Sequence, residues 1–312
     1  MSVGPGAYCG AMSSTPPSGA PPAAPSGTAA DAATEARPQL GTPVDGVDVL
    51  GSLSPSRAAD FRSCPLMFRF RTIDRLPEQP SPEAVRGTVV HQVLEDLFDL
   101  PAPERTPERA LEMVPGAWDA VLTREPELAA VFEDGSAASW QDACRGALRT
   151  YFELEDPRRL EPAERELYVE ALLDSRLLLR GFLDRLDEAP DGALRIVDYK
   201  TGRAPSPGFE ARALFQLRFY ALVLWRTRGV VPRELRLIYL GDGQTVSWSP
   251  DVEDLLATER LVEAVWRAIE HGHRTGEWLP QPGFACRWCS FRDLCPEYGG
   301  TPPPLPARPA AG

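Results

Sequence analysis

Lysine, asparagine and isoleucine are scarce in this chain of 312 residues. Of the 33 basic side chains only Lys200 is a lysine, asparagine is absent, and isoleucine occurs four times. Arginine therefore takes almost every basic position. Arginine carries a planar and permanently charged guanidinium, whereas lysine carries a compact ammonium whose pKa can shift. A position that keeps lysine in such a composition is a candidate for a role that only an ammonium can fill.

Long apolar segments are also missing. No run approaches the roughly 20 apolar residues that a membrane-spanning helix needs, so we expect none. The first residues lack a basic stretch followed by an apolar one, so we expect no secretory signal and a cytoplasmic location. In a reducing compartment the six cysteines favour metal ligands or free thiols over a disulfide framework.

Proline is abundant, with 33 residues concentrated at the two ends of the chain. Residues 1–50 and 299–312 are rich in proline, alanine and glycine and have few large apolar side chains. Such segments cannot bury enough surface to offset the entropy lost on ordering. We therefore predict two disordered tails around one folded domain at 51–298, which is long enough to bury a core.

Within the predicted domain the spacing of apolar residues changes along the chain. It predicts helices over roughly 54–64, 81–97, 107–123, 136–156, 209–228 and 252–271. It predicts strands over roughly 167–173, 176–186, 194–200, 235–240 and 245–248. This order indicates a mixed α/β core with a helical N-terminal part.

Two of the predicted strands bring acidic side chains together. A turn signal centred on Asp191 separates the second predicted strand from the third. If that turn is symmetric about Asp191, Asp184 lies opposite Asp198. Because side chains alternate between the faces of a strand, Asp198 and Lys200 share one face. The hairpin therefore combines two carboxylates with the single ammonium of the chain.

This combination predicts a metal site. Directly opposed carboxylates repel each other, so we expect a cation between Asp184 and Asp198. Mg²⁺ or Mn²⁺ fits, because hard divalent ions prefer carboxylate oxygens. Such an ion polarises a phosphoryl oxygen and acidifies water, and the Lys200 ammonium could orient or deprotonate that water or stabilise charge on the phosphate. The alternative is a surface hairpin in which these residues form ordinary ion pairs.

Four short motifs resemble one nuclease family. The segments GFLDRLD at 181–187 and IVDYKTG at 196–202 resemble two motifs of the RecB-type branch of the PD-(D/E)xK nuclease superfamily. Gly87 and His91 match its Gly-x-x-x-His motif, and Gln216 and Tyr220 match its Gln-x-x-x-Tyr motif. The four motifs occur in the order that the family shows. The resemblance extends over most of residues 53–298.

The resemblance implies a restriction-endonuclease-like core, in which helices flank a mixed central sheet. It implies that His91, Asp184 and Asp198 bind the metal, that the main-chain carbonyl of Tyr199 can be a further ligand, and that Lys200 is catalytic. A lone histidine on an apolar helix is otherwise more often a satisfied, partly buried residue.

Gln216 and Tyr220 lie one turn apart on a predicted helix and therefore share a face. A buried glutamine needs hydrogen-bond partners. We expect both residues to contact and position the active-site side chains without binding the metal themselves. The resemblance also implies that they contact nucleic acid.

The cysteines follow a three-plus-one pattern, with Cys286, Cys289 and Cys295 close together and Cys64 far upstream. Thiolates at such spacing favour a soft metal or a cluster. The pattern resembles the [4Fe–4S] staple of AddB-type and CRISPR-adaptation members of the same branch. The resemblance implies an iron–sulfur-stapled C-terminus, with zinc, free thiols or a disulfide as alternatives.

Together these features predict a Mg²⁺- or Mn²⁺-dependent DNA nuclease. We expect an exonuclease of recombination or repair that acts on single strands or strand ends. A Walker A motif needs a lysine, and the only lysine of the chain, Lys200, belongs to the predicted active site. The chain therefore has no Walker A motif, and we expect no bound nucleotide. Unwinding would fall to a separate helicase. The alternatives are an inactive nuclease fold that binds DNA or scaffolds a complex, and a zinc-stabilised nucleic-acid-binding protein.

Overall fold

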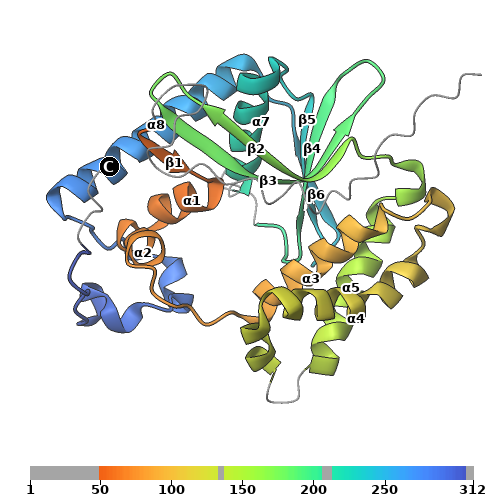
Figure 1. Ribbon diagram of the computed structural model, residues 1–312, viewed down its shortest axis with the longest axis horizontal. Coiled ribbons are helices and arrows are strands. Elements are labelled where there is room, and N and C mark those ends of the chain that lie inside the picture. The colour runs from red at the N-terminus through yellow and green to blue at the C-terminus, as the bar shows by residue number, and fades with distance from the viewer. Residues whose placement is uncertain (1–48, 133–136, 206–212, 307–312) are drawn as a thin grey trace, which may run out of the picture. The chain divides into compact units, whose positions relative to one another are not determined.

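A computed structural model describes residues 49–132, 137–205 and 213–306 of the chain. No helix in these ranges is both long enough and apolar enough to cross a membrane. Within the described residues a six-stranded mixed sheet forms the centre, with the order β1-β3-β4-β5-β6 and with β2 on the other edge of β3 (Figure 1). The strands are β1 (Gly51–Leu53), β2 (Glu164–Leu172), β3 (Leu177–Glu188), β4 (Leu194–Lys200), β5 (Glu234–Tyr239) and β6 (Gln244–Trp248).

The strand directions make the sheet mixed. β1 runs parallel to β3 and β4 runs parallel to β5, whereas the pairs β2–β3, β3–β4 and β5–β6 are antiparallel. The predicted fold class, a mixed central sheet flanked by helices, is confirmed.

Seven α-helices flank the sheet, and short 3₁₀ or π turns join the elements. The α-helices are α1 (Pro55–Ser63), α2 (Pro65–Phe68), α3 (Pro82–Leu97), α4 (Pro107–Arg124), α5 (Ala137–Leu154), α7 (Phe215–Arg228) and α8 (Val252–Thr275), counted within the described ranges. The turns are η2 (Arg69–Ile73), η3 (Ala102–Glu104), η4 (Pro126–Phe132), η5 (Pro157–Arg159), η6 (Phe284–Trp288), η7 (Arg292–Leu294) and η8 (Pro296–Tyr298).

Local sequence explains where several helices begin and end. The Ser81 side chain accepts a hydrogen bond from the Ala84 backbone N–H, so it caps α3, and Pro82 occupies the first helical position. Helix α7 ends at Gly229, whose φ of 69° is the left-handed conformation that glycine adopts without strain. The predicted start of this helix near 209 lies outside the described residues.

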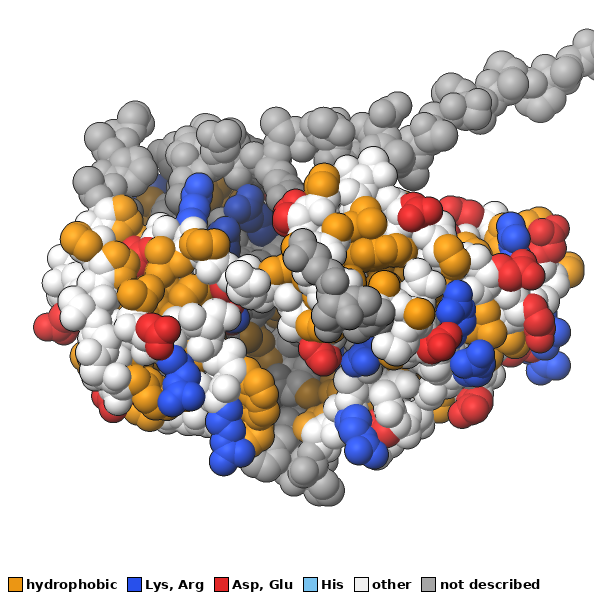
Figure 2. All heavy atoms as spheres, turned by 90° about the horizontal axis from the view of Figure 1, so that it is seen from below, with side chains coloured by type: hydrophobic (Ala, Val, Ile, Leu, Met, Phe, Trp, Pro, Cys, Tyr) orange, Lys and Arg blue, Asp and Glu red, His pale blue; other side chains and the backbone are white. Residues whose placement is uncertain are grey.

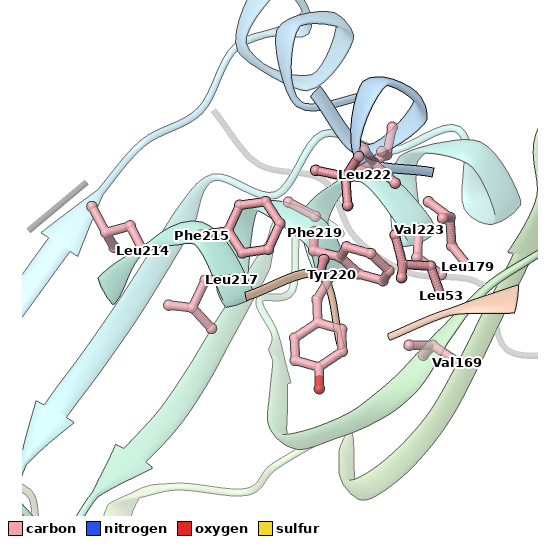
Figure 3. Close-up of a cluster of buried hydrophobic side chains, with 14 of the residues drawn as sticks. Leu53, Val169, Leu179, Leu214, Phe215, Leu217, Phe219, Tyr220, Leu222 and Val223 are labelled. Carbon is pink, nitrogen blue, oxygen red and sulfur yellow. The ribbon is translucent and has the colours of Figure 1, made fainter. Parts of the chain in front are cut away.

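Two hydrophobic clusters cover the two faces of the sheet. The first packs α1, α7 and α8 against one face and includes Leu53, Phe219 and Leu222 (Figure 3). The second packs α3, α4 and α5 against the other face, where Val197 and Ile238 meet them. Helices α3, α4 and α5 therefore form a separate layer beneath the sheet in Figure 1.

Strands β2 and β3 are kinked at one point. They pair continuously except at Glu166 and Asp184, which face each other in the register, and Glu166 has a φ of 42°. Leu183 and Leu186 contribute to the same hydrophobic cluster, although strict alternation would place residues three apart on opposite faces. The kink at Asp184 therefore changes which face of the sheet the following β3 side chains point to. Local distortions of this kind often re-aim a side chain beside an active site.

The end of the described chain packs against the domain. Arg69 donates a hydrogen bond to the Pro303 carbonyl, and Leu305 packs against the first hydrophobic cluster. These contacts fall within 299–306, which is part of the predicted disordered tail. Residues 1–48, which hold Cys9, and 307–312 lie outside the described residues.

Candidate metal centre and active site

His91 on α3 reaches the kinked part of the sheet. Its Nε2 atom lies 2.9 Å from the Tyr199 carbonyl oxygen, and its Nδ1 atom lies 3.5 Å from Asp184 Oδ2 and 4.0 Å from Glu166 Oε1. The helix carries His91 next to a buried apolar face that includes Val90 and Leu94. The ring therefore lies at the edge of the core, beside the Glu166 carboxylate on β2, the Asp184 carboxylate on β3 and the Tyr199 carbonyl on β4.

Glu166 was missed in the sequence. His91, Glu166 and Asp184 each offer one ligand atom, and these atoms lie within 4.8 Å of one another, so the three could hold a metal ion. Glu166 stands in no motif that the sequence analysis used. Its position becomes informative only through the β2–β3 register, which places it opposite Asp184.

The hairpin turn is symmetric about Asp191, as predicted, because Arg185 pairs with Val197 and Glu188 pairs with Leu194. The paired ladder ends one step before Asp184 and Asp198. There the Asp184 carboxylate replaces a backbone partner, since Asp184 Oδ2 accepts a hydrogen bond of 2.8 Å from the Tyr199 N–H. The same bond holds Asp184 beside the Tyr199 carbonyl that contacts His91.

Asp198 is buried, at 2% exposure, and its Oδ2 atom lies 2.6 Å from Lys200 Nζ. Apart from this ion pair, neither carboxylate oxygen accepts a hydrogen bond from any residue the structure describes. Burial, followed by the nearby Asp184 charge, raises the pKa of Asp198 to about 6. A buried carboxylate with spare acceptor capacity fits a cation site.

Glu166 shows the same crowding of negative charge. Burial, followed by the Asp184 carboxylate, raises the pKa of Glu166 to about 7, and His91 opposes the shift. The Glu166 and Asp184 carboxylates, the His91 imidazole and the Tyr199 carbonyl come together, which is a donor set for a hard divalent ion. The predicted ligand Asp198 is not a member of this close group and instead pairs with Lys200. The residues present therefore fit the expected Mg²⁺ or Mn²⁺.

Lys200 is held by two partners. Besides the Asp198 carboxylate, its ammonium donates a hydrogen bond of 2.9 Å to Gln216 Oε1 on α7. Lys200 remains one-third exposed, at 34% of its side chain. Gln216 fixes the direction of the ammonium without neutralising it.

Tyr220, one turn further along α7, packs against the backbone of Gly181 on β3. At Gly87 on α3 a methyl group would meet only Thr201 Oγ1 at 3.7 Å, an ordinary contact, so lack of space does not require a glycine there. Gly181, by contrast, is approached closely, since a Cβ atom there would lie 2.7 Å from Tyr220 Cε1.

A buried arginine lies beneath the site and was not singled out in the sequence. Arg185 is 1% exposed and forms an ion pair with Glu155 of α5 at 2.7 Å and with Asp187 at 3.0 Å. Its guanidinium also donates to the Tyr199 hydroxyl. Because Tyr199 supplies both the N–H that binds Asp184 and the carbonyl that contacts His91, this network ties the helical layer to the metal centre.

Four cysteines line a single cavity of about 920 Å³ at the other end of the domain. They are Cys64, Cys286, Cys289 and Cys295, and all four are free thiols. The backbone N–H groups of Gln281 and Gly283 point at the sulfurs of Cys64 and Cys286, at 3.4 and 3.3 Å. Cys144 lies apart from them, buried in the second hydrophobic cluster.

Two aromatic groups near these cysteines behave differently. Phe291 is 3% exposed and packs on Phe70, so it shields the cysteine region, whereas Trp288 is 69% exposed.

Figure 2 shows hydrophobic side chains beside a hollow in one face of the molecule, with basic side chains near its rim. Locally basic surface on a chain of net charge −12 can still guide a polyanion.

Comparison with known proteins identifies the family. Residues 52–296 match the model of the PD-(D/E)XK nuclease superfamily, and the chain belongs to this superfamily of metal-dependent phosphodiester hydrolases. The chain is 25% identical to the Gene 69 protein of Mycobacterium phage D29 over 268 residues, which covers 78% of this chain and 96% of that protein.

Two further similarities are more limited. The chain is 29% identical over 128 residues to one subunit of the ATP-dependent helicase/deoxyribonuclease of Streptococcus equi subsp. zooepidemicus (strain H70), and the match covers 40% of this chain and only 12% of that relative. A crystal structure from Eubacterium rectale, named as that of a candidate exonuclease, shares the fold with a TM-score of 0.52. It is 13% identical and covers 82% of this chain and 91% of its own.

Proposed function

We propose that this protein is a Mg²⁺- or Mn²⁺-dependent DNA nuclease of the RecB type that works as an exonuclease in recombination or repair. One observation carries the proposal, which is the convergence of His91, Glu166 and Asp184 beside the Asp198–Lys200 pair. The deoxyribonuclease name of the streptococcal relative agrees with DNA as the substrate. The exonuclease name of the structural neighbour agrees with attack at strand ends.

In this proposal His91, Glu166 and Asp184 would hold the divalent ion, with Asp198 and the Tyr199 carbonyl as further ligands. The bound ion supplies a Lewis acid that polarises the phosphate and acidifies water. The chain places its own charges around that reaction, and the Tyr199 N–H keeps Asp184 turned toward the site.

Lys200 is the catalytic residue of the proposal. Its ammonium, directed by Asp198 and Gln216, orients the attacking water and compensates the negative charge that develops on the phosphate. An ammonium beside a buried carboxylate can also pass a proton, which a guanidinium does poorly. Strand separation would come from a separate helicase.

We also propose that Cys64, Cys286, Cys289 and Cys295 hold a [4Fe–4S] cluster. Four thiols around one cavity, with N–H groups directed at two of the sulfurs, suit a metal–sulfur site, in which such hydrogen bonds tune the metal. The cluster would join α1 to the C-terminal turns and so close a long loop, which restricts the unfolded chain.

A cleavage assay tests the nuclease proposal. End-labelled single- and double-stranded DNA is incubated with protein in Mg²⁺, in Mn²⁺ and in EDTA, alongside the Asp184→Asn and Asp198→Asn variants. We expect metal-dependent release of short products by the wild type and loss of at least ~100-fold in both variants. An RNA substrate and a circular DNA substrate separate deoxyribonuclease from ribonuclease activity and end-dependent from internal cleavage.

Two outcomes would replace the proposal by its rivals. DNA binding without cleavage in any metal would identify an inactive nuclease fold that serves for binding or as a scaffold. Stoichiometric zinc at the cysteines together with absence of cleavage would identify a zinc-stabilised nucleic-acid-binding protein.

A further inference from the structure

The main chain of Tyr199 holds two side chains of the metal centre. Its N–H donates a hydrogen bond of 2.8 Å to Asp184 Oδ2, and its carbonyl oxygen lies 2.9 Å from His91 Nε2. The N–H and the carbonyl of one strand residue point to the same side of the strand. Because the β3–β4 ladder ends at the pair Arg185–Val197, these two groups are left for side chains. The orientation of Tyr199 therefore sets the positions of both Asp184 and His91.

The side chain of Tyr199 is anchored at its far end. Arg185 donates a hydrogen bond to the Tyr199 hydroxyl, and its guanidinium carbon lies 5.6 Å from the centroid of the Tyr199 ring. The Tyr151 ring packs edge-on against the same ring at 5.8 Å, and both tyrosines are buried in the second hydrophobic cluster. The contact with Arg185 therefore limits how far Tyr199 can turn.

Arg185 is itself fixed by two carboxylates. Its Nη1 and Nη2 atoms donate hydrogen bonds of 2.7 and 3.0 Å to the two oxygens of Glu155, which is the strong forked geometry of an arginine–carboxylate pair. Its Nε atom lies 3.0 Å from Asp187 Oδ1. Glu155 directly follows α5, in the helical layer that also carries His91 on α3 (Figure 1). Two negative charges therefore balance the buried guanidinium.

A cavity of about 10 Å³ lies at the metal centre. His91, Glu166, Asp184 and Tyr199 line it, and Arg185 is also part of its wall. Such a volume is about that of one water-sized sphere. Mg²⁺ demands short bonds in near-ideal octahedral geometry, whereas Ca²⁺ accepts longer bonds and variable geometry. A small cavity with fixed walls therefore favours the smaller ion.

We propose that Glu155, Arg185 and the Tyr199 side chain form a positioning clamp that makes the metal centre selective for Mg²⁺ over Ca²⁺. Arg185 holds the Tyr199 ring, and the Tyr199 main chain in turn holds Asp184 and His91. Arg185 is a positioning residue, because it acts on the metal ligands through Tyr199. Since carboxylates balance its charge, Arg185 can lie beside a cation without repelling it.

This inference rests on the proposed nuclease function, whose metal centre it concerns, and it is tested by metal binding without cleavage. Metal-free full-length protein is titrated with Mn²⁺, and the free ion is followed by its electron paramagnetic resonance signal. Mg²⁺ and Ca²⁺ are then measured as competitors of Mn²⁺. The variants are Tyr199→Phe, which removes only the hydroxyl, and Glu155→Gln. Circular dichroism confirms that each variant is folded.

Two matched controls remove similar contacts outside the metal centre. Tyr168→Phe removes a hydroxyl that donates a hydrogen bond of 2.7 Å to Glu170 Oε2. Glu259→Gln alters a forked pair with Arg226, which joins α8 to α7. Neither control should change the affinity for any of the three ions.

We expect Tyr199→Phe to weaken Mg²⁺ binding by about 10- to 100-fold, the range for a residue that orients metal ligands. Ca²⁺ binding should weaken less, so the preference for Mg²⁺ over Ca²⁺ should fall. Glu155→Gln should weaken the binding of both ions, because Arg185 then keeps excess positive charge beside the cavity.

Three results would overturn the clamp. They are wild-type Mg²⁺ affinity in Tyr199→Phe, an equal loss of Mg²⁺ and Ca²⁺ affinity in that variant, or equal effects of Glu155→Gln and Glu259→Gln. If the wild type cuts DNA while Tyr199→Phe binds Mg²⁺ normally, only the clamp is wrong. If Tyr199→Phe loses Mg²⁺ affinity as expected but the wild type cuts no DNA in Mg²⁺ or Mn²⁺, the clamp stands and the nuclease proposal fails.

Discussion

The ring of Tyr220 lies directly against the backbone of Gly181. A Cβ atom on Gly181 would come within 2.7 Å of Tyr220 Cε1 and 3.1 Å of its hydroxyl oxygen. Tyr220 is buried between α7 and the sheet, at 5% exposure, and cannot easily move aside. The glycine of the Gly-x-x-Asp segment therefore has a steric role, because it lets α7 approach β3 closely and bring Gln216 to Lys200.

Gly181→Ala should therefore destabilise the fold. We predict a loss of about 1–3 kcal/mol in the free energy of unfolding, because a methyl group overpacks a buried contact. Urea denaturation followed by circular dichroism measures the loss.

The double variant Gly181→Ala/Tyr220→Leu provides the control, because removal of the phenol ring relieves the overlap. The alanine should cost less in the Tyr220→Leu background than in the wild type. Strictly additive effects would show that the contact does not constrain Gly181.

The metal centre should make stability depend on pH. The pKa of Glu166 is raised to about 7 from its ordinary 4.5, so the charged form is disfavoured in the folded protein without metal. Its contribution to stability is complete below the ordinary pKa and is lost as the pH rises through about 7. In EDTA, we predict that Tm falls between about pH 5 and pH 8 and that Glu166→Gln reduces this fall.

Added Mg²⁺ or Mn²⁺ should reverse the trend, because the ion binds the charged carboxylates. The increase in Tm with metal should be larger at high pH than at low pH and smaller in Glu166→Gln. The exposed Glu153 of α5 gives a matched control, Glu153→Gln, which should leave both effects intact. Identical pH profiles for Glu166→Gln and wild type would contradict the role of Glu166.

The cysteine cavity gives a prediction about metal content. Protein purified without oxygen should be brown and contain iron and sulfide in equal amounts. Cys289→Ser should lose both, whereas the control Cys144→Ala, at a buried cysteine of the second hydrophobic cluster, should keep them. Iron and sulfide analysis with the visible spectrum checks this. Stoichiometric zinc in protein made under iron-replete conditions would contradict the cluster.

Sequence reasoning succeeded where the determinants are local. A turn signal and the alternation of side chains were enough to predict the hairpin symmetric about Asp191, and the structure confirms its register. The period of apolar residues likewise predicted the mixed α/β class. Both depend on residues close together in the chain.

The rest of the site depends on contacts that no local pattern encodes. Glu166 joins the centre through the β2–β3 register and a kink with positive φ, and Arg185 acts through Glu155 on a separate helix. Gln216 can reach the Lys200 ammonium because α7 packs closely against β3, and Gly181 permits this close packing. A single sequence gives no measure of such distances.

The roles of Lys200 and Gln216 differ in a way that kinetics can separate. Gln216 directs the ammonium through one neutral hydrogen bond, whereas Lys200 supplies the charge itself. Gln216→Ala should therefore slow single-turnover cleavage less than any change that removes the ammonium.

The most direct test of the account is single-turnover cleavage by Lys200→Arg at saturating Mg²⁺ or Mn²⁺, with DNA binding measured in parallel. Net charge is unchanged, and arginine serves at every other basic position of this chain. We predict that the variant folds and binds DNA but cleaves at least ~100-fold more slowly, since a guanidinium is too broad for the space beside Asp198 and does not readily exchange a proton. Cleavage within a few-fold of wild type would contradict the assignment of Lys200 as the catalytic ammonium.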